Sequence, residues 1–120
     1  MRFFSLLFLL SISIYAQTPY EMGRDLYMEK ACYSCHGPKA EGMHNYPYLA
    51  NRAKGFLEYK LKRFRDKKAD NQQQEMMVAY TVGLSDAEIE YLVTFLYEYK
   101  DEEQKERYDD SYQVHGDGGS

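Results

Sequence analysis

The chain has 120 residues, which leaves room for one small domain and a short tail but not for a second catalytic module. Its formal net charge is −4. Seven acidic and two basic side chains in residues 101–120 contribute −5 and Arg2 contributes +1, so residues 17–100 are close to neutral. The acidity therefore belongs to the tail, 101–120, which has too little apolar surface to fold and which we expect to be disordered.

The first sixteen residues have the pattern of a secretory signal peptide. Met1 and Arg2 give a positive start, an apolar stretch begins at Phe3, and the small residue Ala16 ends it. An uncleaved membrane anchor is the alternative, but the stretch is shorter than the ~20 apolar residues that a helix needs to cross a bilayer. We therefore expect cleavage of residues 1–16, export to a bacterial periplasm, and no stable membrane insertion of the mature chain.

Helical periodicity predicts the first helix of the mature chain from Tyr20 to about Tyr33. Its apolar residues recur near helical spacing: Met22, Leu26, Tyr27 and Ala31. A loop follows over residues 37–50, because glycines and prolines interrupt this stretch too often for regular structure.

A second helix is predicted over residues 54–66. Leu57, Leu61 and Phe64 fall on one face of it, and its basic residues fall largely on the other faces, as an amphipathic helix requires. Residues 67–75 then lose all apolar periodicity, which predicts a polar surface loop.

The last predicted helix begins at Ser85 and ends near Tyr99. Ser85 and Glu88 form a capping box, in which each side chain can satisfy a backbone N–H group at the start of the helix. No stretch of the chain alternates convincingly enough to build a sheet, and no internal repeat is present. The sequence therefore predicts an all-α domain.

The two cysteines of the chain stand in the pattern Cys32-Tyr33-Ser34-Cys35-His36. This is the spacing of covalent haem attachment: both thiols can add to the vinyl groups of one haem, and the adjacent His36 is then held beneath the iron. The 13 tyrosines of the chain also suit packing against an apolar ring. The pattern therefore predicts one covalently bound haem c, attached through Cys32 and Cys35.

Three other interpretations of the cysteines are weaker. A structural disulfide across so short a loop would stabilise little and would leave His36 without a role. A thioredoxin-like redox pair needs a strand–helix–strand context, whereas the segment before Cys32 is predicted to be helical. A zinc site needs four ligands, and beyond the cysteines only three histidines remain: His36, His44 and His115.

With this motif, residues 20–99 resemble the short class I cytochromes c of bacteria. Gly23 and Tyr27 stand where that family places a small residue and an aromatic residue at the crossing with its C-terminal helix, and Phe95 resembles their aromatic partner. The resemblance implies a class I cytochrome c fold, in which three to five helices wrap around one covalently bound haem. Between the predicted signal peptide and the acidic tail, this domain is predicted to occupy residues 17–100.

The resemblance also implies the proximal ligand of the haem iron, which is His36. The segment Pro47-Tyr48-Leu49-Ala50 resembles the family loop whose proline carbonyl accepts a hydrogen bond from that imidazole. Such a bond would fix the tautomer of His36 and strengthen its donation to iron.

The distal ligand follows from a family spacing, which puts the axial methionine seven residues before the residue that corresponds to Leu84. This count selects Met77, with its neighbour Met76 as the rival. His44 is a third candidate, because its loop follows closely behind the attachment motif and haems with two histidine ligands exist.

The chain departs from the family pattern in its loops. Ala40 stands where the family often has Gly, Asn51-Arg52 replaces its usual Gly-Gln, and Lys67 and Ala69 replace its Gly and its Arg. Residues 72–75 lengthen the loop before the methionines. These departures bear on loop geometry more than on the fold.

An iron held by both His36 and Met77 has no open position, so we expect an electron carrier and not an enzyme. The resemblance implies transfer between a cytochrome bc-type complex and a terminal oxidase or reductase. The alternatives are a haem enzyme or sensor with an open axial position, and an electron-transfer subunit permanently docked to a dehydrogenase or reductase.

Residues 52–68 carry eight basic and two acidic side chains, a net charge of +6. The segment is either a docking face for an acidic redox partner or simply a solvated helix face. We do not expect nucleic acid to be a partner of an exported haem protein, and we expect the chain to act as a monomer.

Overall fold

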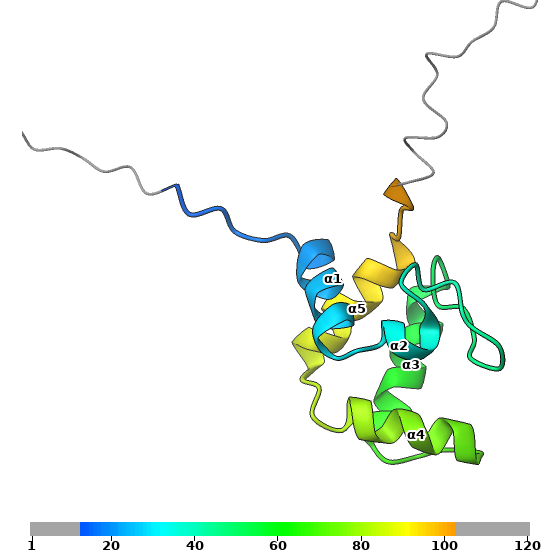
Figure 1. The fold of residues 1–120 in the computed structure, drawn as a ribbon. Coiled ribbons are helices and arrows are strands. Elements are labelled where there is room, and N and C mark those ends of the chain that lie inside the picture. The colour runs from blue at the N-terminus through cyan, green and yellow to red at the C-terminus, as the bar shows by residue number, and fades with distance from the viewer. Residues whose placement is uncertain (1–12, 103–120) are drawn as a thin grey trace, which may run out of the picture.

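The computed structural model describes residues 13–102, and this part of the chain forms five helices and no sheet (Figure 1). In chain order they are α1 (Pro19–Glu29), α2 (Tyr33–His36), α3 (Lys54–Arg65), α4 (Gln72–Thr81) and α5 (Asp86–Tyr97). The predicted all-α fold is confirmed. Most of the predicted signal peptide and most of the predicted disordered tail lie outside the described residues. No helix within residues 13–102 has the length and apolar character that a membrane span requires.

The centre of the fold is the crossing of α1 and α5. A Cβ atom on Gly23 would overlap the carbonyl oxygen of Tyr91 and would lie 2.6 Å from the Cβ of Phe95, so only glycine permits this close approach. Phe95 also packs against Tyr27, with the ring centroids 5.5 Å apart. The predicted contact of Gly23 and Tyr27 with the last helix is therefore confirmed.

α1 ends at Glu29, earlier than the sequence predicts. Ala31 has a φ of 57°, in the left-handed region. Its N–H donates to the carbonyl of Met28 at 3.1 Å, and the N–H of Cys32 donates to the carbonyl of Tyr27 at 3.0 Å. This pair of bonds is a Schellman motif, which ends a helix and turns the chain. The cysteine motif therefore begins a separate helical turn, α2, instead of closing α1.

The loop over residues 37–50 is irregular, as predicted, but it packs against the core. Ala40 is fully buried, and its carbonyl accepts hydrogen bonds from the N–H groups of Leu49 at 2.8 Å and Ala50 at 3.1 Å. These bonds fold the loop back on itself and bring its second half beside α2.

Asn51 attaches the end of this loop to α5. Its backbone N–H donates to the carbonyl of Leu96 at 2.7 Å. Its side-chain amide donates to the carbonyls of Tyr97 and Tyr99 at 3.1 and 2.9 Å. Since the last carbonyls of a helix have no partner within the helix, Asn51 caps the C-terminal end of α5.

α3 ends in a second Schellman motif. Lys67, with a φ of 61°, donates its N–H to the carbonyl of Phe64 at 2.9 Å, and Lys68 donates to Arg63 at 2.9 Å. The predicted helix over 54–66 is confirmed to within one residue, because it ends at Arg65.

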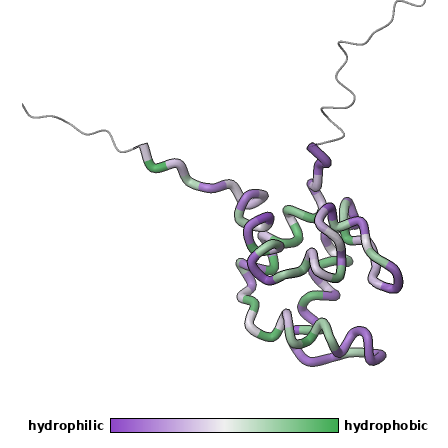
Figure 2. Tube along the Cα trace, in the orientation of Figure 1, coloured by the Kyte–Doolittle hydropathy of each residue, from purple (hydrophilic) through white to green (hydrophobic). Residues whose placement is uncertain are grey.

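The predicted polar loop over 67–75 is wrong in its second half, because α4 begins at Gln72. Asn71 caps it: the side-chain oxygen accepts the N–H of Gln74 at 2.9 Å. Figure 2 shows that the chain entering α4 is hydrophilic and becomes hydrophobic further along the helix. Periodicity therefore gave no signal for the first turn. α4 packs chiefly against α3, and Thr81 is its buried residue.

The predicted capping box at the start of α5 is confirmed. The Ser85 hydroxyl accepts the N–H of Glu88 at 3.1 Å, and the Glu88 carboxylate accepts the N–H of Ser85 at 3.1 Å. The helix then buries five residues: Ile89, Leu92, Val93, Phe95 and Leu96. It ends at Tyr97, slightly before the predicted end.

Candidate functional site

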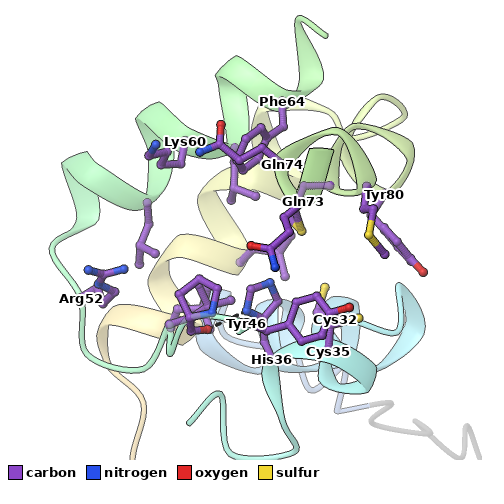
Figure 3. A pocket seen from close by; sticks show the side chains of 18 of the residues that line it. Cys32, Cys35, His36, Tyr46, Arg52, Lys60, Phe64, Gln73, Gln74 and Tyr80 are labelled. Atoms are coloured by element: carbon purple, nitrogen blue, oxygen red, sulfur yellow. Dashed lines mark hydrogen bonds between the residues drawn. The ribbon is translucent and has the colours of Figure 1, made fainter. Parts of the chain in front are cut away.

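A cavity of about 430 Å³ lies between the cysteine motif and helices α3 and α4 (Figure 3). Its volume is within the range of about 300–1,000 Å³ that is usual for ligand and cofactor pockets. All five helices contribute to its lining, which is largely apolar and aromatic. The aliphatic and Phe side chains of α3 and α5 that line it are Phe56, Leu57, Leu61, Phe64, Leu92 and Leu96. The cavity is thus continuous with the core and is suited to an apolar group.

Both cysteines reach this cavity as free, half-buried thiols. Burial raises the pKa of Cys32 to about 11, so its side chain is a neutral thiol at neutral pH. A redox-active cysteine needs the opposite, a lowered pKa that populates the thiolate. The environment of Cys32 therefore disfavours a thioredoxin-like pair, and no disulfide joins it to Cys35.

His36 is 5% exposed, and its ring faces into the cavity above α2 (Figure 3). Its Nδ1 lies 2.8 Å from the carbonyl oxygen of Pro47. Because a carbonyl can only accept, Nδ1 carries the proton in this bond, and Nε2 keeps the lone pair that a metal needs. Burial lowers the pKa of His36 and the Pro47 carbonyl raises it; burial dominates, which favours the neutral ring.

The backbone around His36 is held from several directions. The Tyr27 hydroxyl donates to the carbonyl of Gly37 at 2.5 Å, which ties α1 to the residue after the histidine. The N–H of Gly42 donates to the carbonyl of His36 at 2.8 Å. The ring of Tyr46 meets the imidazole edge-on, with centroids 6.5 Å apart. These contacts place His36 before any ligand binds.

α4 forms another wall of the cavity. In Figure 3 the side chain of Gln73 extends from α4 toward His36. Met76 and Met77 also line the cavity; Met76 is 49% exposed, whereas Met77 is half-buried. His44 is exposed in its loop and is not part of the cavity lining. Two thiols, one imidazole and two thioethers therefore share a single, largely apolar space.

A family model described as Cytochrome c matches residues 20–100. The chain belongs to the cytochrome c family. The match spans α1 through the end of α5, so the predicted family and fold are confirmed together. Family membership implies haem-based electron transfer and a covalently bound haem c. No curated protein matches this cytochrome c closely enough to count as a relative.

The cavity of this cytochrome c fits a haem. Its lining is apolar where a macrocycle would pack, and its nitrogen and sulfur donors are of the types that hold haem iron. The thiols of Cys32 and Cys35 are the groups that can form thioether bonds, and the ring of His36 already has the tautomer that leaves Nε2 for a metal.

Six basic and amide residues of the lining escaped the sequence analysis: Asn45, Arg52, Lys60, Asn71, Gln73 and Gln74. The sequence placed Gln73 in a loop, yet it stands four residues before Met77 and so shares a face of α4 with it. Lys60 was assigned to a face away from the apolar residues. It lies four residues before Phe64, on the apolar stripe of α3, and this spacing was the signal that could have found it.

Proposed function

We propose that this cytochrome c carries single electrons between respiratory-chain components in the bacterial periplasm. The donor would be of the cytochrome bc-type class and the acceptor a terminal oxidase or reductase. A bound haem supplies the one-electron couple. The observation that carries the proposal is that His36 and the methionines of α4 line one cavity. An iron site ligated by both has no position for a substrate, which favours a carrier over an enzyme or sensor.

In this proposal Cys32 and Cys35 hold the haem through thioether bonds, and His36 is the proximal ligand through Nε2. The 2.8 Å contact of Nδ1 with the Pro47 carbonyl supports this assignment, because it selects the tautomer and fixes the plane of the ring. A histidine oriented before binding adds little ordering cost when it coordinates the iron.

Met77 is the distal ligand that we propose. It is less exposed than Met76, as a side chain that contacts a buried iron must be. The backbone carbonyl of Met77 also accepts a hydrogen bond from the hydroxyl of Thr81 at 3.0 Å, and Thr81 is 1% exposed. The turn that contains Met77 is therefore anchored to the one buried position of α4.

The test is the absorption spectrum of the oxidised holoprotein, in which methionine bound to ferric haem gives a weak far-red band. Met77→Leu should abolish this band and let the reduced protein bind carbon monoxide. Met76→Leu is the matched control, a neighbouring residue with the same change, and should keep the band. Loss of the band in Met76→Leu alone would transfer the assignment to Met76. A wild-type protein that lacks the band and binds carbon monoxide readily would overturn the carrier proposal.

The basic charge of segment 52–68 supports docking to an acidic partner. Fewer of its cations are available for docking than the sequence suggests. Three basic residues of segment 52–68 are paired with carboxylates: Lys62 with Glu58, Arg63 with Asp70, and Arg65 with Asp86. Two others, Arg52 and Lys60, line the cavity. Lys54, Lys67 and Lys68 remain exposed and have no carboxylate within 4.0 Å in the described part of the chain. We propose that these three lysines steer the encounter with a partner.

A further inference from the structure

Two cations lie in the wall of the cavity. Arg52 precedes α3 and Lys60 lies within it, and both side chains are half-buried. Neither has a carboxylate partner within residues 13–102. The lining contains no Asp or Glu, and its other titratable groups are three tyrosines, the two cysteines and His36. A partly desolvated cation without a counter-ion is unfavourable, so this pair favours a ligand that brings negative charge.

The position of Arg52 is fixed by stacking. Its guanidinium carbon lies 4.8 Å from the ring centroid of Tyr48 and 4.6 Å from that of Phe56. The ammonium of Lys60 lies 5.9 Å from the centroid of the same Phe56 ring. A guanidinium that stacks on two aromatic rings keeps its planar fork available for a carboxylate at little further entropic cost.

The two cations and the two cysteines lie on different sides of the cavity. Figure 3 shows Arg52 and Lys60 on one side of His36, and Cys32 and Cys35 on the other. Haem has a matching asymmetry, since its two vinyl groups and its two propionates are at opposite edges of the ring. If Cys32 and Cys35 bind the vinyl edge of the haem, the propionate edge therefore points toward Arg52 and Lys60.

We propose that Arg52 and Lys60 bind the two haem propionates and thereby raise the reduction potential and keep the propionates ionised. This inference rests on the proposed haem site. A nearby cation stabilises the less positive, reduced state of the iron and lowers the pKa of the carboxyl group that it pairs with.

The experiment measures the reduction potential of the holoprotein against pH. In the wild type the potential should stay level above about pH 5, because paired carboxyls remain ionised there. Arg52→Gln and Lys60→Gln should each shift the reduction equilibrium about tenfold toward the oxidised protein, a fall of about 59 mV for one electron. In both variants the potential should rise again as the pH falls, because a propionate that has lost its cation takes up a proton.

Lys68→Gln is the matched control, since it removes the same charge from an exposed lysine outside the cavity. It should leave the pH dependence unchanged and shift the potential much less. Arg52→Lys keeps the charge without the planar fork, so its reduction potential should lie between those of the wild type and Arg52→Gln. Equal shifts in all four variants, with no new pH dependence, would overturn the role of Arg52 and Lys60 while leaving the haem site intact. A chain that attaches no haem at Cys32 and Cys35 would overturn both proposals.

Discussion

Three residues that replace family glycines keep the backbone conformation of glycine. Ala40, Asn51 and Lys67 have φ values of 52°, 60° and 61°. The left-handed region costs an ordinary L-residue about 1–2 kcal/mol, and Asn less because its side chain can bond locally. All three substitutions therefore keep a left-handed backbone that glycine adopts freely, and the chain accepts local strain at Ala40 and Lys67.

Lys67→Gly should stabilise the holoprotein by up to about 1 kcal/mol, because the relieved strain exceeds the extra entropy of glycine in the unfolded chain. Urea unfolding measures the change. The adjacent Lys68→Gly removes the same exposed side chain at a residue without a positive φ, and it should instead destabilise. Equal effects of the two substitutions would show that backbone strain at Lys67 is not the cause.

Gly23→Ala should destabilise the protein by about 1–3 kcal/mol or more, because the added methyl group would overlap the Tyr91 carbonyl and force α1 away from α5. Gly55→Ala is the control. It also adds a methyl group within a helix, but no atom lies within 4 Å of its position, so it should be neutral or stabilising. Unfolding midpoints in urea distinguish the two; a neutral Gly23→Ala would mean that the helices do not cross so closely.

At the scale of elements, Asn51 attaches the end of the loop over residues 37–50 to the C-terminal end of α5. Asn51→Gly keeps the left-handed backbone and loses the two side-chain hydrogen bonds to the helix end, and we expect a cost of about 1 kcal/mol. Asn51→Ala loses the same bonds and adds about 1–2 kcal/mol of backbone strain. If both variants unfold at the same urea concentration, the positive φ at residue 51 does not strain alanine.

Arg65 joins the end of α3 to the start of α5 and makes their packing sensitive to pH. It donates to the Asp86 carboxylate at 2.6 Å and to the Leu84 carbonyl at 3.3 Å. The Arg65 hydrogen bond and charge lower the pKa of Asp86. The pair therefore contributes stability fully above the unfolded pKa, about 3.9, and loses it as the pH falls through the lower folded pKa.

Asp86→Asn should therefore lower the urea midpoint slightly at neutral pH, as expected of an exposed ion pair, and should match the wild type in acid, where both lack the charge. Glu90→Gln removes a carboxylate from an exposed position of the same helix that has no ion pair among the described residues, and it should have little effect at either pH. If the urea midpoint of Asp86→Asn also stays below that of the wild type in acid, the loss of the ion pair is not the cause.

Apolar periodicity and caps were enough to predict α1, α3 and α5, because each buries a stripe of residues against another helix. α4 could not be predicted in this way. Its first turn consists of three glutamines and one glutamate, and its methionines face the cavity instead of another helix. The end of α1 was missed for a different reason, because the alanine at its C-terminal turn gives no signal of a left-handed residue where glycine would.

For the whole molecule, the proposed docking role of Lys54, Lys67 and Lys68 gives a kinetic prediction. A variant with Lys54, Lys67 and Lys68 all changed to Gln should bind an acidic redox partner more slowly at low salt and should lose most of the salt dependence of the wild type. Stopped-flow electron transfer measures the association rate. The double variant Lys62→Gln/Glu58→Gln is the control, because it removes an ion pair without changing the net charge, and it should change the rate much less.

Local spacing predicted Cys32, Cys35 and His36, and the family resemblance added Pro47 and Met77, which also line the cavity. Cys32, Cys35 and His36 occupy one short motif, so their spacing alone specifies a shared ligand. The spacing of Lys60 on the apolar stripe of α3 could have indicated its place, whereas Arg52 precedes α3 and reaches the cavity through tertiary packing that no local pattern encodes. The net charge of segment 52–68 therefore suggested one surface, whereas the structure divides its cations between ion pairs, the cavity wall and solvent.

α4 has one buried residue and rests chiefly on α3, while Met77 and Tyr80 face the cavity. The crossing of α1 and α5, by contrast, is held by direct contacts between the two helices and does not require a group bound in the cavity. During maturation we therefore expect α1, α5 and the cysteine motif to assemble first and to present both thiols to the attachment machinery while α4 stays away. α4 would then pack last, and maturation would end when the proposed ligand Met77 reaches the iron.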